Sequence, residues 1–320
     1  MKKFLLVLLR FFFGYGQKSF VPTTSQAPLE TGKHTPPNKV SFFIVAHPDD
    51  IELFMGREAR HQVLNQDIDR KVFIVLSAGD ANRKNRKKPF RRVSWWQARE
   101  QAHTTAISFW NEHKDQVFEQ EIQVNQRTIT KITMGSQIHL YNFRLPDADK
   151  TTSLAELVYQ QKDSISDLVH QQRYSLDDIK QSLIEIVKSE SQQAEQANFY
   201  IMDCDHERNP NDHKDHQATS LIVLDILPKI SVKEKTLSGY LTYFIKTKPV
   251  NLEGEDRTKS FETWALMGDV LDCCGYKKND DEHHMQWVGK EYKSFQIQPD
   301  QDMDEIHNLN KLRHPQKSEA

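Results

Sequence analysis

Two segments of this sequence are dense in histidine and aspartate, residue types that could hold a metal ion for catalysis. The first, "AHPDDIE", spans residues 46–52, and the second, "CDHERNPNDHKDH", spans residues 204–216. Mixed histidine and carboxylate ligands favour zinc or a similar divalent ion, and three protein ligands with one open position are typical of a catalytic site. Asp49 and Asp50 are adjacent, so their side chains diverge. One can therefore bind the ion while the other faces the bound water.

Both segments also have structural explanations. Pro48 suits the first position of a helix, where neighbouring carboxylates cap free N–H groups and stabilise the helix dipole. His213 and His216 are three residues apart and would share one helical face. Cys204 and His206 could join them in a structural zinc site, but this spacing fits no common zinc finger and leaves the first segment unexplained. Cys204 ends an apolar run, where a buried cysteine behaves as a small hydrophobic residue.

Each segment lies where an apolar run gives way to a segment with helical periodicity. The runs "VSFFIVA" from Val40 and "KVFIVLSAG" from Lys71 are typical of buried parallel strands, and a helix is expected between them from Ile51 to about Gln66. Further helices are expected at 94–111, 175–190, 214–227 and 260–274, and further strands in "QIHLYNF", "ANFYIMDC" and "TLSGYLTYFI". This alternation predicts a single-domain α/β fold with a doubly wound, mostly parallel sheet. Such sheets bind ligands at the carboxyl ends of their strands, where both segments lie.

The length and composition predict three parts. The 320 residues are 37% hydrophobic, which is enough for one sizeable core. We expect an apolar segment and flexible linker over residues 1–39, a catalytic domain over 40–297 and a charged tail over 298–320. The N-terminal "MKKFLLVLLRFFFGYG" has features of a secretory signal, but Arg10 interrupts its apolar run. Export, membrane association and a cytoplasmic location all stay open, as does the oligomeric state.

Charge and cysteine content exclude some classes of function. The net charge of -2 and the lack of a base-stacking array argue against nucleic acid as a partner, and three cysteines are too few for a disulfide framework. The basic segment "RKNRKKPFRR", residues 83–92, is expected to be a solvated lid or to contact an anionic substrate. Trp95 and Trp96 beside it could stack on sugar rings or pack in the core.

The two segments together resemble the signature of the N-acetylglucosaminyl-phosphatidylinositol de-N-acetylases, or LmbE-like family of zinc amidases. That signature has an AHPDD(x)E box after the first strand and an HxDH box later, and this chain has "AHPDDIE" and "HKDH" in that order. The resemblance covers about Val40 to the middle 220s. It implies a Rossmann-like three-layer sandwich.

The resemblance also implies roles for individual residues. Zinc, or another divalent metal such as Fe²⁺, would be bound by His47, Asp50 and His216. Asp49 would be the general base. Protonated His213 would be the acid or the oxyanion partner, and Asp215 would orient it.

Four further residues receive supporting roles from the resemblance. Asp147 in "FRLPDAD" would line the substrate pocket. The "QARE" segment offers Arg99 and Glu100 as the Arg/Glu pair that the family carries on a helix, with Arg99 as a second substrate-binding residue. Glu52, which closes the first box, would brace the first helical turn.

The expected function is zinc-dependent hydrolysis of an N-acetyl group on an N-acetylglucosaminyl-type sugar or conjugate, which releases acetate and a free amine. The substrate would be a small molecule or glycan that carries an acetamido sugar, and both neutral and anionic substrates stay open. Two alternatives stay open. One is a carbohydrate-binding module in which the metal only stabilises the fold, and the other is a metallo-hydrolase that acts on another amide or on a phosphoester.

Overall fold

The computed structural model describes residues 37–81, 93–147, 153–280 and 282–300. All of them belong to the unit Pro36–Ala320, one of two into which the chain divides. The predictions for the N-terminal segment, the basic segment 83–92 and most of the charged tail lie outside these residues. Within them, no helix is both long and apolar enough to cross a membrane.

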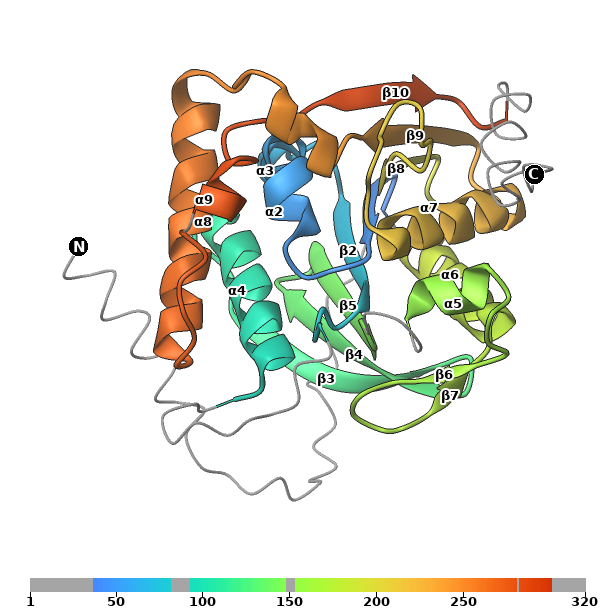
Figure 1. The fold of residues 1–320 in the computed structure, drawn as a ribbon. Helices are drawn as coiled ribbons and strands as arrows, with labels where there is room; N and C mark the ends of the chain where they lie inside the picture. Colours follow the sequence, from blue (N-terminus) through green and yellow to red (C-terminus); the bar gives the residue numbers. More distant parts are fainter. Residues whose placement is uncertain (1–36, 82–92, 148–152, 281, 301–320) are drawn as a thin grey trace. The chain divides into compact units, whose positions relative to one another are not determined.

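A mostly parallel sheet forms the centre of this unit, as predicted (Figure 1). The described residues give it eight strands in the order β10-β9-β8-β1-β2-β5-β4-β3. The parallel strands are β1 (Lys39–Val45), β2 (Arg70–Ser77), β5 (Ile138–Leu145), β8 (Gln196–Met202) and β9 (Glu234–Tyr240). The strands β3 (Val117–Val124), β4 (Arg127–Met134) and β10 (Lys293–Ile297) pair antiparallel at the two edges. The ordered strands thus begin at Lys39 and end at Ile297, and the domain boundaries at 40 and 297 stay a prediction.

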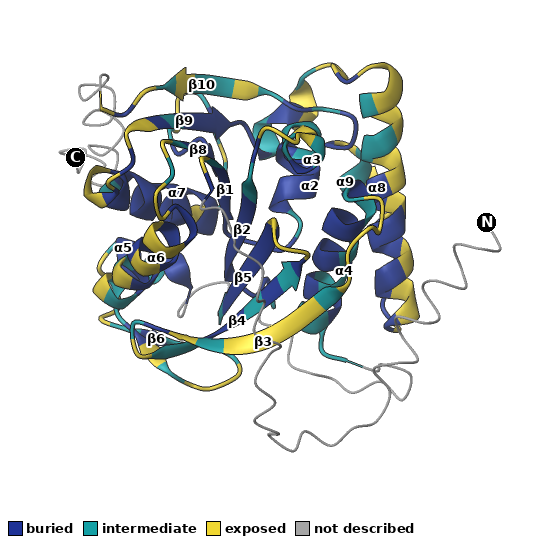
Figure 2. Ribbon diagram, turned by 180° about the vertical axis from the view of Figure 1, so that it is seen from behind, coloured by how far each residue is buried: buried dark blue, intermediate teal, exposed yellow. Residues whose placement is uncertain are grey.

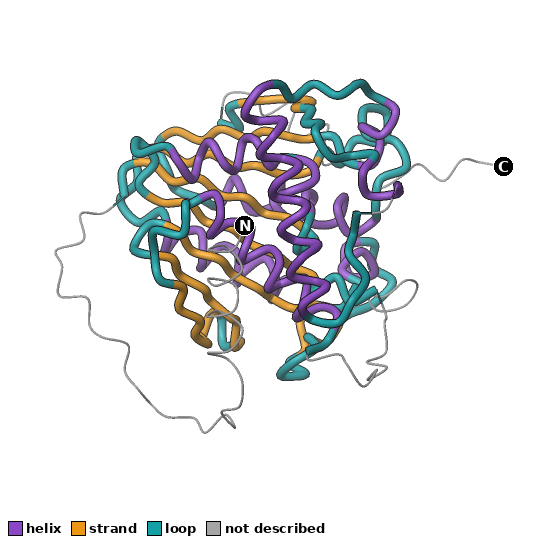
Figure 3. Tube along the Cα trace, turned by 90° about the vertical axis from the view of Figure 1, so that its left-hand side faces the viewer, coloured by secondary structure: helices purple, strands orange, loops and turns teal. Residues whose placement is uncertain are grey.

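Helices cover both faces of the sheet, which confirms the three-layer α/β sandwich (Figures 2 and 3). One side carries α2 (Asp50–Phe54), α3 (Gly56–Leu64), α4 (Trp95–Trp110) and, outside α4, α8 (Gly254–Cys273). The other side carries α5 (Leu154–Val158), α6 (Leu176–Glu190) and α7 (Lys214–Ile226). Successive side chains of a strand point to opposite faces. Phe42 therefore packs in the core under α6 and α7, and Phe43 packs in the core under α3 and α4.

Several elements differ from the sequence-based expectation. The helix expected from Ile51 to about Gln66 is interrupted at Met55, which has φ -143° and separates α2 from α3. The hairpin of β3 and β4 was not predicted, and it turns through Asn125 and Gln126, both at positive φ. The expected strand "TLSGYLTYFI" ends at Tyr240 and continues as the 3-10 helix η2 (Tyr243–Thr247). The sequence prediction also missed η1 (Leu227–Lys229), the short strands β6 (Ile165–Ser166) and β7 (Arg173–Tyr174), α5, β10 and α9 (Glu282–Met285).

The arrangement of β1 and β8 brings the two boxes together. These strands are parallel neighbours, with Phe43 paired to Tyr200. Their carboxyl ends therefore meet at one edge of the sheet, and the two boxes leave the sheet side by side.

Candidate metal centre

The first box turns from β1 into α2. Asp49 occupies the N-cap position of α2 but makes no side-chain hydrogen bond to the helix. Asp50, which is buried, accepts a hydrogen bond from the backbone N–H of His47 at 2.7 Å and closes the turn. The side chain of Asp49 therefore does not cap α2, and this structural explanation for the adjacent aspartates does not apply.

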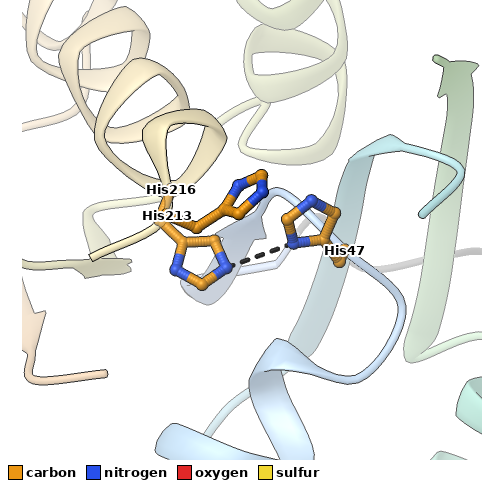
Figure 4. Close-up of side chains that lie close together, drawn as sticks. All are labelled: His47, His213 and His216. Carbon is orange, nitrogen blue, oxygen red and sulfur yellow. Dashed lines mark hydrogen bonds between the residues drawn. The ribbon is translucent and has the colours of Figure 1, made fainter. Parts of the chain in front are cut away.

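The second box brings His216 against the first (Figure 4). His216 lies in the first turn of α7 and is completely buried. Its Nε2 atom is 3.1 Å from Nδ1 of His47 and 3.0 Å from Oδ1 of Asp50. Nδ1 of His47 is in turn 3.5 Å from Oδ2 of Asp50. The structure thus brings together the three side chains expected to bind the metal.

The hydrogen-bond chemistry of this cluster calls for a cation. Nδ1 of His216 is 2.7 Å from Oδ1 of Asp212, and a carboxylate can only accept, so this nitrogen carries the hydrogen. Nε2 of a neutral His216 then presents a lone pair to Asp50 and His47. Two imidazole nitrogens and a carboxylate oxygen are a donor set that zinc accepts, and a carboxylate behind a ligating histidine is the usual support. The residues present therefore fit a divalent metal ion.

The pKa shifts of these residues also indicate that the cluster favours positive charge. Burial opposes protonation of His47, but Asp50 and Asp147 raise its pKa to about 10. The pKa of His216 is raised well above its ordinary value, because Asp50 and Asp212 outweigh burial. The pKa of Asp50 is correspondingly lowered despite its burial. A bound cation can take the place of the protons that these histidines hold.

His213 occupies the N-cap position of α7, and a backbone N–H group of that helix fixes its ring. Its Nδ1 atom accepts a hydrogen bond of 3.2 Å from the backbone N–H of Asp215. In a neutral imidazole the hydrogen is then on Nε2, 3.9 Å from Oδ1 of Asp147. Burial, together with His47 and His216, lowers the pKa of His213 to about 4. In the metal-free protein this shift favours a neutral imidazole with an N–H donor, and the protonated His213 expected during the reaction stays a prediction.

Asp215 is buried, and its carboxylate contacts α5 rather than the ring of His213, which it was expected to orient. Its carboxylate Oδ1 accepts a hydrogen bond of 2.8 Å from the backbone N–H of Ala155 in α5, and burial raises its pKa. Asp215 thus orients His213 through its main chain, whereas its side chain fixes α5 against α7. Both residues, with His47 and Asp147, form one set of possible ligands within 4.8 Å of one another, and His47, His213 and His216 form a second set. His213 is therefore also close enough to serve as a ligand.

Helix α4 holds the first box from the side. A capping box of Ser94 and Gln97 starts the helix, and Arg99 one turn later donates a hydrogen bond to Oδ1 of Asp49. Arg99 also donates to the carbonyl of Gly79 at 2.6 Å. Gly79 has φ +62°, and a Cβ there would lie 1.9 Å from the guanidinium, so only glycine leaves room for this contact.

The remaining supporting residues have separate partners. Glu52 braces α2 through a 2.7 Å contact with Nδ1 of buried His103, four residues after Arg99 on α4. Glu100 forms an ion pair with Arg144 at 2.9 Å and does not line the cavity described below. Asp147 lies on the cavity wall, where Oδ2 is 3.7 Å from Nε2 of His47.

The rival site built on Cys204 does not form. Cys204 is buried in the hydrophobic core under α7, as its apolar surroundings indicated. His206 contacts the side chain of Gln217 at 3.2 Å. Neither residue belongs to a set of possible metal ligands in the part of the chain that the structure describes.

A cavity of about 390 Å³ opens beside the cluster. His47, Asp49, Arg99 and His213 line it from the two boxes and α4, and Trp95 also faces it. Trp96 instead lies under the guanidinium of Arg144.

Sequence reasoning missed Asp212, Thr242 and Tyr243. Asp212 could have been found, since it lies four residues before His216 in the second box. Thr242 donates a hydrogen bond to Asp212, and the ring of Tyr243 lies 5.3 Å from that of His216 on the cavity wall. Nothing in the late segment around these two residues signals such a position.

The solved structures that resemble this chain are distant. N,N'-diacetylchitobiose deacetylase from Pyrococcus horikoshii is 13% identical, with 85% of this chain and 82% of that chain covered and a TM-score of 0.42. A zinc-inhibited form of teicoplanin deacetylase Orf2 is 12% identical, with 73% and 84% covered and a TM-score of 0.40. The 4-carboxy-2-hydroxymuconate hydratase GalB from Pseudomonas putida KT2440 is 10% identical, with 78% and 82% covered and a TM-score of 0.35. Similarity at this level carries no argument about the reaction.

The sequence comparison is more specific. No curated protein sequence matches the chain. Residues 42–227, more than half of the chain, match the family model described as PIG-L, GlcNAc-PI de-N-acetylase. The matched residues include both boxes and α4. Thr242 and Tyr243, which contact the second box from beyond α7, lie outside the match. This chain belongs to the PIG-L family of GlcNAc-PI de-N-acetylases.

Proposed function

We propose that this protein is a metal-dependent N-deacetylase that removes the acetyl group from an acetamido sugar or its conjugate, with zinc bound by His47, Asp50 and His216. The observation that carries the proposal is the convergence of two imidazole nitrogens and one carboxylate oxygen, all from buried side chains. Nε2 of His216 lies 3.0 Å from Asp50 and 3.1 Å from His47. Family membership supports the choice of an amide bond as the target.

Bound zinc would supply two effects, a lower pKa for an attacking water and polarisation of the acetyl carbonyl. Asp49 would accept the proton of that water, because Arg99 fixes its Oδ1 atom and Asp49 lines the cavity. Nε2–H of His213 would donate a hydrogen bond to the oxyanion. A donor in that position commonly contributes about 3–4 kcal/mol.

The leaving amine needs a proton, and the state of His213 decides its source. The pKa of about 4 that His213 has in the metal-free protein favours a neutral imidazole, which would donate a hydrogen bond rather than a proton. Asp49, after it has taken a proton from water, would therefore return that proton to the nitrogen. One residue would act as base and then as acid.

Two substitutions test the assignment. We expect Asp49→Asn to keep the metal and lose acetate release by more than about a hundredfold, since general acid–base catalysis contributes about 10²–10⁴-fold. His216→Ala should lose both metal and activity. Metal content by atomic emission and acetate release from N-acetylhexosamine conjugates are the measurements, and Asp163→Asn, at an exposed aspartate that does not line the cavity, is the control.

Other outcomes would redirect the proposal. Equal loss of metal in both variants would contradict the role of Asp49 as base. Metal-dependent melting without acetate release would favour a binding module. Phosphate release from an aryl phosphate would favour a phosphoesterase.

A further inference from the structure

The candidate metal centre has a polar side and an aromatic side. On the polar side, Nε2 of His47 lies 3.7 Å from Oδ2 of Asp147. On the aromatic side, the ring centre of His216 lies 5.3 Å from that of Tyr243 and 6.0 Å from that of Phe54. The amide of an N-acylated sugar has two substituents, the sugar on its nitrogen and the acyl chain on its carbon. The two sides of the centre are suited to different substituents.

The aromatic side continues into an apolar part of the cavity. The ring centre of Trp287 lies 5.2 Å from that of Tyr243 and 6.3 Å from that of Phe54. The indole N–H of Trp287 donates a hydrogen bond of 3.1 Å to the carbonyl of Tyr243, so its polar atom is occupied within the wall.

Helices α2, α4 and α8 complete this part of the cavity. Helix α8 packs against both α2 and α4, and in Figure 1 it lies on the opposite side of α2 from α7. These helices contribute further buried apolar side chains to the cavity lining, namely Leu53, Ala102, Met267 and Leu271. Together with Phe54, Tyr243 and Trp287 they form what we call the apolar subsite.

The basic residues that follow α8 lie at the mouth of the cavity. All four that line it are exposed or half-exposed, namely Lys277, Lys278, His283 and His284. Asn279 is buried, but its side-chain oxygen lies against Gly268 of α8, where an added Cβ would be 2.9 Å away. The apolar side chains of α8 that line the cavity are buried. The interior of this wall is therefore mainly apolar.

The cavity is larger than an acetyl group requires. Its volume of about 390 Å³ falls within the range of about 300–1,000 Å³ that is typical of pockets for drug-sized ligands. The family match ends at residue 227, so Tyr243, Trp287 and all of α8 lie outside it. The match therefore gives no information about most of the apolar subsite.

We propose that the apolar subsite binds the acyl chain of the substrate, and that the enzyme prefers a butanoyl or longer acyl group to acetyl. This inference rests on the proposed hydrolysis of an N-acylated amino sugar. The acyl chain is attached to the reacting carbon, so with the carbonyl at the metal centre the aromatic side beside His216 is within its reach. The sugar hydroxyls can then donate hydrogen bonds to Asp147 on the polar side.

The reaction is the same for a longer chain. Water adds its oxygen to the acyl carbon, the C–N bond breaks, and the products are a fatty acid carboxylate and the free amine, with the protons handled as in the proposed deacetylation. The longer chain removes more apolar surface from water, which favours its binding. One methylene group in a hydrophobic pocket changes kcat/KM by about tenfold or more.

The test compares kcat/KM for amine release from the methyl glucosaminides that carry an N-acetyl, N-butanoyl or N-hexanoyl group. For the zinc-loaded wild type we expect the butanoyl substrate to exceed the acetyl substrate by about tenfold. Ala102→Leu and, separately, Leu271→Phe fill the apolar subsite and should each lower this ratio by about tenfold. Ala265→Leu, at an exposed position of α8 that does not line the cavity, should keep the wild-type ratio.

The ratio cancels any general damage to folding or metal binding. A wild-type ratio at or below one, or an unchanged ratio in both filled variants, would overturn the proposal. A preference for octyl over methyl N-acetylglucosaminide without any acyl preference would assign the apolar subsite to the aglycone and would also overturn it.

Failure of the proposed deacetylation would be distinguishable. If no substrate releases an amine, that function fails, and calorimetric binding of hexanoate and acetate to the zinc-loaded protein then tests the subsite separately. Tighter binding of hexanoate that is weakened in Ala102→Leu but not in Ala265→Leu would support the subsite. Equal binding of the two carboxylates would overturn it.

Discussion

Asp212 determines which ring nitrogen His216 would offer to the proposed metal. Its Oδ1 atom accepts the Nδ1–H of His216 at 2.7 Å and also a hydrogen bond from Thr242, and its side chain is fully buried. This arrangement fixes the tautomer and the ring orientation, so the lone pair of Nε2 points to Asp50 and His47. Asp212 is therefore a positioning residue rather than a ligand.

Removal of the Asp212 charge should weaken metal binding without abolishing the fold. Asp212→Asn can still accept from His216, but it makes His216 a poorer ligand. We expect the metal dissociation constant to rise about 10–100-fold, measured by chelator competition. Asp163→Asn should bind as tightly as wild type, and an unchanged constant in Asp212→Asn would exclude the positioning role.

At the scale of elements, α3 begins where the sequence predicted an uninterrupted helix. Met55, at its N-cap position, provides no side-chain hydrogen bond. Glu291 does so instead: its Oε2 atom accepts from the backbone N–H groups of Arg57 at 2.7 Å and Glu58 at 3.2 Å. The cap comes from 234 residues away, so no local pattern could reveal the break.

This cap should make stability depend on pH. Burial, only partly offset by Arg57, raises the pKa of Glu291 to about 7, above its ordinary 4.5. The folded protein therefore holds the proton more tightly than the unfolded chain, and stability is lost as pH rises from about 4.5 to about 7. Relative to Glu291→Gln, which does not titrate, the wild type should lose about 1–3 kcal/mol between pH 5 and pH 8 in urea unfolding. Glu253→Gln, at an exposed site, should track the wild type, and a constant difference between wild type and Glu291→Gln would contradict the assignment.

The β3–β4 hairpin shows a second limit of sequence reasoning at this scale. Buried strands such as β1 were found because all but Lys39 are buried apolar or small residues. The outer strand β3 has only Val124 buried, so it carries no continuous apolar run. Its turn through Asn125 and Gln126 lacks the glycine that most two-residue hairpins have.

At the scale of the molecule, the site was predictable where it depends on local sequence. His47 lies two residues beyond β1, and His213 and His216 lie at the start of α7, so each box could be assigned to the carboxyl edge of a parallel sheet. The cavity wall from Tyr243 to Trp287 was not predictable. It depends on how the later part of the chain returns over α2 and α4, and its residues resemble ordinary core and surface positions in the sequence.

The proposed metal would join two chain segments far apart in sequence, so its removal should destabilise the whole unit in a pH-dependent way. In the metal-free protein, protons on His47 and His216 supply the positive charge. The folded pKa of His47, about 10, exceeds its ordinary 6.5, so this contribution is full below about pH 6.5 and is lost as pH rises toward 10. Zinc needs the unprotonated histidines, so its stabilising effect should grow over the same range.

We therefore expect a chelator to lower the melting temperature more at pH 8.5 than at pH 6. At a hundredfold excess of zinc over its dissociation constant, bound metal contributes about 2.7 kcal/mol, or roughly 4 °C for a chain of this size. Differential scanning calorimetry with and without chelator at the two pH values measures the effect. His216→Ala, which lacks a ligand, should show little response to chelator at either pH. An equal chelator effect on the wild type at both pH values would mean that the two histidines do not exchange their protons for the metal, because a metal held by other ligands would not compete with them.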